Sequence, residues 1–125
     1  MLQARAAIAI VSVTDIMSRP KDLVQGTLDA LILRTVAAEP LHGLAIAHRL
    51  RARSEEVLKV SRGSLYPALH KLEHEGFLRA EWRLAESGKR AKYYALTRAG
   101  VRRLANETED WERLSTAISL VLKPT

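Results

Sequence analysis

The chain has 125 residues and no cysteine, which limits it to one small domain without disulfides, thiolate metal ligands or a cysteine nucleophile. A hydrophobic fraction of 47% allows a small core, and an aromatic fraction of 5% predicts helices packed mainly through aliphatic side chains. The net charge of +6 is typical of a nucleic-acid-binding protein. The lack of cysteine is typical of the reducing cytoplasm, where we expect the protein to reside.

Residues 1–21 are predicted to form a poorly ordered N-terminal extension. An apolar run from Ala6 to Val13 faintly resembles a signal peptide, but no convincing cleavage site follows it. The run is also far shorter than the roughly 20 residues that span a bilayer, so we expect no membrane partner. Because residues 1–16 differ in character from the rest, Met17 is a candidate for the natural start.

Two helices are predicted after this extension. Over residues 22–38, apolar side chains recur at the spacing of one helical face, and Pro40 ends the pattern. A second helix begins after His42 and continues through Leu50, with histidine and arginines on its other face. The connector that follows includes a short predicted strand at 57–58.

A third helix is predicted over residues 61–75. Pro67 limits where it can begin, because a proline in the helix interior loses a hydrogen bond and clashes with the preceding turn. If Ser64 is the N-cap, Pro67 lies harmlessly in the first turn; if Ser61 is the N-cap, the first turn must be distorted. Gly76 is predicted to end the helix in a left-handed conformation. The buried stripe consists of Leu65, Ala68, Leu69 and Leu72.

The pattern then changes to a basic β-hairpin. Apolar and charged residues alternate over residues 78–84, which predicts a half-buried strand with Trp82 in the core of the hairpin. A turn is predicted at 87–90, and a tyrosine-rich strand returns over 91–96. Residues 78–103 hold eight basic side chains against two acidic ones, so this stretch is suited to contacts with phosphates.

A final amphipathic helix is predicted over residues 98–122, with Thr97 as its N-cap. Its apolar seam has no remaining partner within so short a chain, so we expect it to pair with a second copy. The predicted dimerisation residues are Leu104, Trp111, Leu114, Ile118 and Val121.

Three helices, a basic hairpin and a long helix predict a fold that is mainly α with a small β-hairpin. This is a winged helix-turn-helix domain over residues 22–97, followed by a dimerisation helix over 98–122. Five motifs, in this order and spacing, resemble the PadR-like transcriptional regulators, in particular the subgroup with a single short C-terminal helix. They are Gln25-Gly26-Thr27-Leu28, Leu41-His42-Gly43, Gly63-Ser64-Leu65-Tyr66-Pro67-Ala68-Leu69, Leu72-Glu73 with Gly76, and Tyr93-Tyr94-Ala95-Leu96-Thr97 with Gly100.

The candidate DNA contacts form two groups. The exposed face of the third helix carries Ser61, Arg62, Gly63, Ser64, Tyr66, Pro67, His70 and Lys71, and the hairpin, or wing, carries Lys89, Arg90 and Lys92 at its tip. The alternative for both is an ordinary solvated surface. His70 and His74 have metal-ligand spacing, but no further ligands accompany them, so we predict neither a metal nor another cofactor.

The resemblance implies a dimeric DNA-binding repressor whose partners are duplex DNA, a second copy and, in many relatives, a small-molecule effector. An inverted-repeat operator follows from a dimer with two recognition helices. Leu44 departs from relatives that carry a bulky aromatic residue after His-Gly, and no effector pocket is inferred from it. An enzyme is not expected, because no P-loop, nucleophile elbow or dinucleotide fingerprint is present. The alternative function is a winged-helix adaptor that binds protein rather than DNA.

Overall fold

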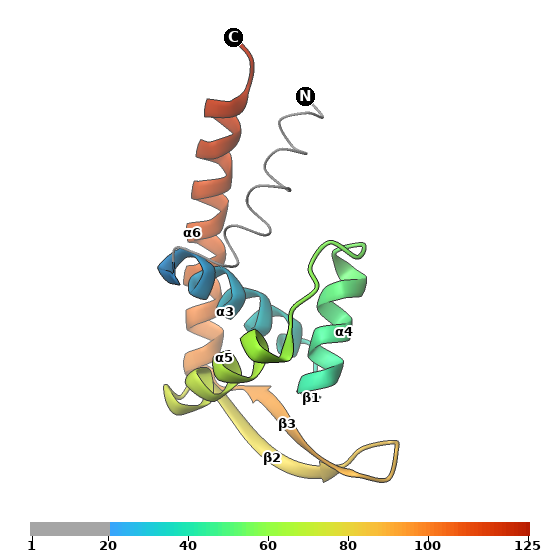
Figure 1. The fold of residues 1–125 in the computed structure, drawn as a ribbon. Helices are drawn as coiled ribbons and strands as arrows, with labels where there is room; N and C mark the ends of the chain where they lie inside the picture. The colour runs from blue at the N-terminus through green and yellow to red at the C-terminus, as the bar shows by residue number, and fades with distance from the viewer. Residues whose placement is uncertain (1–20) are drawn as a thin grey trace.

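The computed structural model describes residues 21–125. The predicted extension over residues 1–21 and its candidate start at Met17 therefore lie outside the described residues, apart from Lys21. The elements follow in the order α3 (Lys21–Ala37), β1 (Leu41–His42), α4 (Gly43–Arg53), α5 (Arg62–His74), β2 (Leu78–Leu84), β3 (Arg90–Leu96) and α6 (Arg98–Leu122). Within residues 21–125, four helices and a small antiparallel sheet confirm the predicted fold class (Figure 1).

The sheet has three strands in the order β1-β3-β2, and not only the two of the predicted hairpin. In β1, Leu41 pairs with Tyr94 and His42 pairs with Tyr93. The sequence pattern does not predict β1, because two residues are too few to show an alternation. The strand ties the start of α4 to the wing, since His42 is also the N-cap of α4 and accepts a hydrogen bond from the Ala45 amide at 3.2 Å.

The strand predicted at 57–58 is wrong. Glu55 and Glu56 adopt positive φ angles of 53° and 74°, which turn the chain sharply after α4. The Val57 amide then donates to the Ser54 carbonyl at 3.2 Å within this turn. Val57 therefore lies in a turn and not in a strand.

Helix α5 begins with Ser61 as its N-cap, the second of the two predicted alternatives. The Ser61 hydroxyl accepts from the Ser64 amide at 3.2 Å, and the Ser61 carbonyl accepts from the Leu65 amide at 2.9 Å. The first turn of α5 is therefore regular, and the distortion predicted for this N-cap is wrong. Pro67 fits inside the helix because the carbonyl it leaves without its usual donor belongs to Gly63, which is exposed to water.

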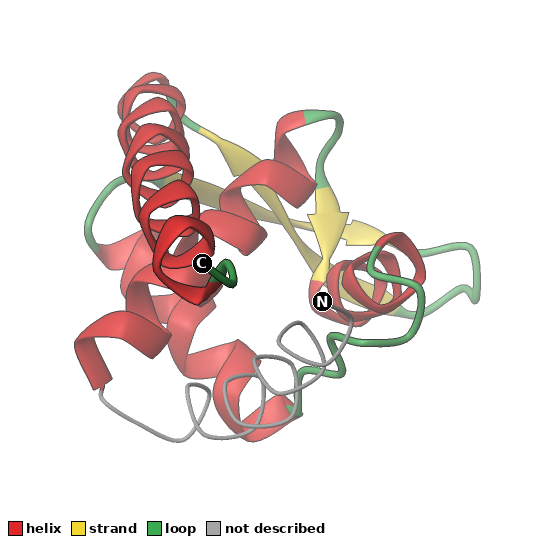
Figure 2. Cartoon of the chain, turned by 90° about the horizontal axis from the view of Figure 1, so that it is seen from above, coloured by secondary structure: helices red, strands yellow, loops and turns green. Residues whose placement is uncertain are grey.

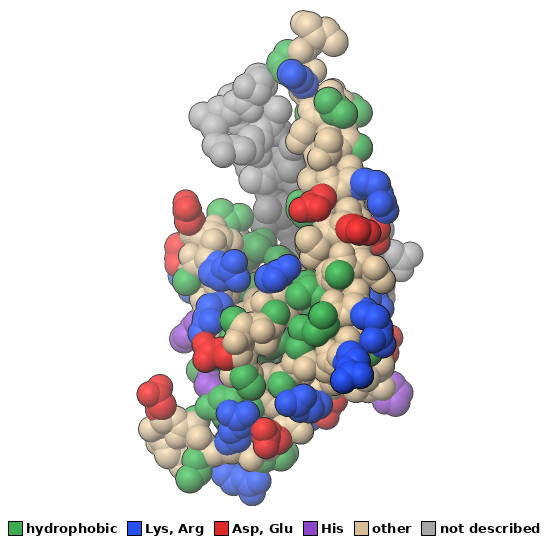
Figure 3. Space-filling view, turned by 180° about the vertical axis from the view of Figure 1, so that it is seen from behind, with side chains coloured by type: hydrophobic (Ala, Val, Ile, Leu, Met, Phe, Trp, Pro, Cys, Tyr) green, Lys and Arg blue, Asp and Glu red, His purple; other side chains and the backbone are tan. Residues whose placement is uncertain are grey.

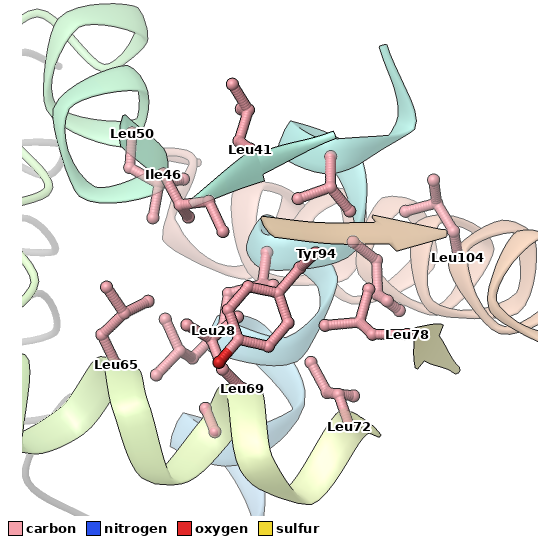
Figure 4. Close-up of a cluster of buried hydrophobic side chains, with 14 residues drawn as sticks. Leu28, Leu41, Ile46, Leu50, Leu65, Leu69, Leu72, Leu78, Tyr94 and Leu104 are labelled. Atoms are coloured by element: carbon pink, nitrogen blue, oxygen red, sulfur yellow. The ribbon is translucent and has the colours of Figure 1, made fainter. Parts of the chain in front are cut away.

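One buried cluster holds all these elements together (Figure 4). Ile32 and Leu33 of α3 are fully buried at its centre, and Tyr94 of β3 packs between the sheet and α5. The predicted stripe of α5 is buried as expected and faces this cluster. Gly76 ends α5 with a φ of +85°, as predicted, and the Phe77 amide closes the helix by donating to the Leu72 carbonyl at 2.9 Å.

Among the described residues, the first turns of α6 hold it to the rest of the domain. The Thr97 hydroxyl accepts from the Gly100 amide at 3.0 Å and donates to the Gly76 carbonyl at 2.6 Å, which confirms Thr97 as the N-cap. Leu104 is 6% exposed and belongs to the core of this chain, so its predicted place in a dimer seam is wrong. The rest of α6 extends away from the sheet (Figures 1 and 2).

Within residues 21–125, no helix combines the length and the apolar composition needed to cross a membrane.

Candidate nucleic-acid interface

The outer face of α5 carries most of the predicted contact residues close together. Its exposed members are Ser61, Arg62, Gly63, Ser64, Pro67 and His70. The start of this face is open, because a side chain built on Gly63 would meet only the Ser61 hydroxyl, at 3.9 Å. Amide groups in the first turn of a helix lack intrahelical partners and favour anions. This end of α5 is therefore suited to a phosphate or an electronegative base edge.

Tyr66 is turned toward α4 and is half-buried. A Cβ atom added to Gly43 would lie 2.6 Å from the Tyr66 hydroxyl oxygen, so the ring occupies the space that Gly43 leaves open. The two helices of the helix-turn-helix approach each other at this point. Tyr66 therefore positions α5 against α4, and only part of its side chain is accessible to a partner.

Lys71 lies on the flank of α5 that faces α3. Its Nζ atom is 3.3 Å from the Asp29 carboxylate, which is 1% exposed, and 3.5 Å from Glu75. A buried carboxylate needs such a partner. Lys71 thus links α5 to α3 through Asp29, and the structure does not bring it together with Arg62 and His70 on the outer face.

The tip of the wing is a tight turn between β2 and β3. The Ala85 amide donates to the Lys89 carbonyl at 2.8 Å, and Gly88 adopts a φ of +86° that favours glycine. Lys89 and Arg90 are exposed here, as predicted. The wing therefore presents two cations at its end, well beyond the helices that cover its base (Figure 1).

Lys92 lies in the middle of the hairpin, and its predicted place at the tip is wrong. It pairs with Trp82 across the hairpin, two residue pairs from Arg90, and its Nζ atom is 2.9 Å from the Glu73 carboxylate of α5. The hydrogen bond to Glu73 raises the pKa of Lys92 above its ordinary value of 10.5, against the opposing effect of burial. Lys92 is therefore a charged link between the wing and α5.

Two apolar residues of the wing, Trp82 and Leu84, are exposed, so the prediction that they belong to a buried face is wrong. The alternation over residues 78–84 predicts one buried face, but only Leu78 is buried, whereas Trp82 and Leu84 are 58% and 71% exposed. The register explains the difference, because Lys92 and Arg90 stand opposite them on the same face. A face with cations on the returning strand cannot lie in a core, and this signal was present in the sequence.

The outer half of α6 forms a second candidate interface. Trp111, Leu114, Ile118 and Val121 are all exposed and recur at spacings of three and four residues, so they share one face of the helix. The space-filling view shows charged side chains of both signs along α6 and hydrophobic ones near its far end (Figure 3). Among the described residues, no group of three or more metal-binding side chains comes together.

Comparisons with known proteins agree with this architecture. The model of the transcriptional regulator PadR-like family matches residues 32–106, from α3 into α6. A transcriptional regulator of Mycobacterium tuberculosis is 33% identical over 87 residues, which cover 70% of this chain and 78% of that protein. The structure of a transcriptional regulator from Clostridium thermocellum has a TM-score of 0.73 at 26% identity and covers 82% of this chain and 99% of its own.

A PadR family transcriptional regulator from Eggerthella lenta has a TM-score of 0.69 at 30% identity and covers 90% of this chain and 96% of its own. These relatives are regulators of transcription and not enzymes, which confirms the prediction of a non-enzymatic protein. The family match covers more than half of the chain and spans both the helix-turn-helix and the wing. This chain belongs to the PadR-like family of transcriptional regulators.

Proposed function

We propose that this regulator represses transcription by binding, as a homodimer, an inverted repeat in duplex DNA. In this proposal α5 enters the major groove, which is wide enough to admit a helix, and the wing contacts the adjacent backbone. The observation that carries the proposal is the outer face of α5, which combines an open helix N-terminus with the exposed side chains of Arg62 and His70.

The charges of the described residues support this orientation. Arg49, Arg51 and Arg83 each form an ion pair with a carboxylate. Arg62, Lys89 and Arg90 are exposed and, within the described part of the chain, form no ion pair with a carboxylate. Cations without a carboxylate partner are available to replace counterions on DNA phosphates.

The proposal also includes how the protein pairs and how a small molecule regulates it. The exposed seam of α6 supports pairing across a two-fold axis, which would present two copies of α5 to one side of the DNA. We further propose that a small apolar effector binds at this seam near Trp111 and releases the operator by changing the spacing of the two helices. Release of the operator by one compound from an aromatic panel would support the effector, and no release by any would remove it.

The decisive experiment is selection of bound sequences from a pool of random duplexes. We expect an inverted repeat whose half-site centres lie about 34 Å apart along the helix. Arg62→Ala should weaken binding to this operator more than binding to random duplex, whereas Arg53→Ala, an exposed cation at the end of α4, should leave the preference unchanged. Failure to enrich any sequence, with binding that is insensitive to salt, would favour the protein-binding adaptor.

A further inference from the structure

Charged side chains gather where α3, the end of α5 and the start of α6 meet (Figure 1). The Lys71 Nζ atom of α5 lies 3.3 Å from the Asp29 carboxylate of α3 and 3.5 Å from Glu75 of its own helix. On α6, the Arg103 guanidinium lies 2.7 Å from Glu107. This hydrogen bond raises the pKa of Arg103 against the effect of burial, and the charges of Asp29 and Glu75 raise it further. We call these five residues the junction cluster.

Asp29 is the buried member of the junction cluster. It is 1% exposed, whereas the side chain of Lys71 is 42% exposed, so the lysine reaches inward from the surface to meet it. A carboxylate removed from water needs a partner in a defined geometry, because an unpaired charge is costly to bury. Apolar contacts between helices carry no such directional requirement. A turn or tilt of α5 that moved Lys71 away would therefore leave Asp29 without this partner.

The end of α5 is also joined to the start of α6. The Thr97 hydroxyl donates to the Gly76 carbonyl at 2.6 Å, and the Thr97 amide donates to the Phe77 carbonyl at 3.1 Å. A Cβ atom added to Gly100 would overlap the Phe77 carbonyl oxygen, so the two backbones are in close contact. The Arg103 guanidinium lies over the Phe77 ring, 4.9 Å from its centre. The position of α5 is therefore linked directly to the first turns of α6.

We propose that the junction cluster fixes the orientation of α5 relative to α6 and thereby sets the half-site spacing that the protein accepts. In a two-fold dimer built on α6, any change in the angle between these helices occurs twice, once in each copy. Asp29, Lys71 and Arg103 are then positioning residues that do not need to touch DNA. This inference rests on the proposed function, because it requires the homodimer and its inverted repeat. The alternative is that the apolar core alone orients α5.

The first test uses a spin label, which the absence of cysteine from the chain makes simple to place. His74→Cys gives one attachment site on the exposed last turn of α5, so double electron–electron resonance measures the distance between the two copies of α5 in the dimer. We expect a single narrow distance distribution for the otherwise wild-type protein. Lys71→Met and Asp29→Asn should each broaden it. Lys71→Arg, which keeps a cation opposite Asp29, should retain the narrow distribution.

The second test measures the accepted spacing directly. The probes are duplexes that carry the half-site selected from the random pool as an inverted repeat, with the spacing lengthened or shortened by one base pair at a time. The wild type should prefer one spacing several-fold over its neighbours, and Lys71→Met should reduce this preference. The slope of log affinity against log salt should stay unchanged, because Lys71 pairs with Asp29 and not with a phosphate.

A double substitution separates positioning from stability. Asp29→Leu/Lys71→Met removes both charges together, and replacing a buried ion pair by apolar side chains of similar size is often neutral or stabilising. We expect this variant to melt at or above the wild-type temperature and still to show a broad distance distribution and a weaker spacing preference. Glu39→Leu/Arg49→Met is the matched control, because this pair, 3.1 Å apart, links α4 to the residues before β1 and not to α5 or α6. It should keep both wild-type properties.

The outcomes that overturn the inference are distinguishable from failure of the proposed function. If Asp29→Leu/Lys71→Met keeps the narrow distribution and the wild-type spacing preference, the apolar core alone orients α5, and operator binding stands unaffected. If this variant does not fold, Asp29→Asn decides in the same two measurements, because asparagine keeps the size of the side chain and removes its charge. If the labelled wild-type protein gives no distance between copies, the homodimer is absent, and the proposed function and this inference both fail.

Discussion

Gly43 at the start of α4 lies against the Tyr66 ring of α5, which fills the space beside it. Gly43→Ala should lower the free energy of unfolding by about 1–3 kcal/mol, since the new Cβ atom would lie 2.6 Å from the Tyr66 hydroxyl and the ring would have to move. Urea denaturation measures this change. Gly63→Ala is the control, because its Cβ would meet only one atom, at 3.9 Å, and stability should stay unchanged or rise by up to about 1 kcal/mol. Equal effects of the two substitutions would contradict the close approach.

Tyr94 and Lys92 together predict a loss of stability in alkaline solution. Burial raises the pKa of Tyr94 above its ordinary value of 10.0, and the hydrogen bond to Glu73 raises the pKa of Lys92 above 10.5. Both groups therefore hold their protons more tightly in the folded state than in the unfolded state. Their contribution to stability is complete below these ordinary values and declines as the pH rises through the raised ones.

Urea denaturation at neutral pH and at a series of pH values above 10.0 tests this prediction. The free energy of unfolding of the wild type should fall over the alkaline series, and Tyr94→Phe should fall less steeply because it lacks the ionisable hydroxyl. If the wild type and Tyr94→Phe decline in parallel, the buried phenol of Tyr94 does not contribute to the alkaline loss.

Residue identities predict the caps well and the directions of long side chains poorly. Ser61, Thr97 and Gly76 occupy their predicted kinds of position because caps depend on local backbone chemistry. Helical spacing also places Tyr66 and Lys71 on or beside the outer face of α5, but it cannot reveal that Gly43 leaves room for a ring or that a buried carboxylate lies on α3. Both facts depend on residues far away in the sequence.

At the scale of elements, the cations of the wing should behave differently, because Lys89 is exposed in the turn at its tip whereas Lys92 is joined to Glu73 of α5. Lys89→Ala should reduce the slope of log affinity against log salt by about one unit without changing stability, because Lys89 is exposed and forms no ion pair among the described residues. Lys92→Ala should also lower the melting temperature, because it removes the link to Glu73.

Glu73→Gln is the matched test of that link. It weakens the ion pair to Lys92 but leaves every cation of the wing in place, so it should lower the melting temperature and keep the salt slope of the wild type. Titration of duplex DNA at several salt concentrations, beside thermal melts of the same variants, gives both quantities. A Lys92→Ala variant with wild-type stability would show that the ion pair does not hold the wing to α5.

The length of an element explains whether the sequence predicts it. The helices of the described residues and the hairpin are long enough to show a period, so their existence and order follow from the apolar pattern. β1 is too short to do so, and the apolar pair at 57–58 lies in a turn that the positive φ angles of the preceding glutamates create. The burial predicted for one face of β2 is wrong, because β3 places cations opposite Trp82 and Leu84 on that face. The alternation within β2 alone does not show this.

At the scale of the whole molecule, Leu104 marks the boundary between two roles of α6. Up to this residue the helix packs on the core, and Leu104→Ala should lower the free energy of unfolding by about 2–5 kcal/mol through the cavity it leaves. The period of α6 runs unbroken from Leu104 to Val121, so the sequence cannot show where the domain ends. Only the length of the packed core determines which part of the seam remains open.

The open part of the seam leads to the last prediction, which concerns assembly. Ile118→Asp should give a monomer in sedimentation experiments at micromolar concentration. A two-fold axis brings the same position of both copies together, so two carboxylates would face each other in an apolar interface. Leu120→Asp is the matched control: Leu120 is also exposed, but it lies roughly 200° around the helix from Ile118 and outside the seam. The Leu120→Asp protein should remain a dimer.

The Ile118→Asp monomer should keep weak binding to random duplex and lose its preference for the inverted repeat, because one copy of α5 can engage only one half-site. An Ile118→Asp protein that still sediments as a dimer would place the dimer interface elsewhere.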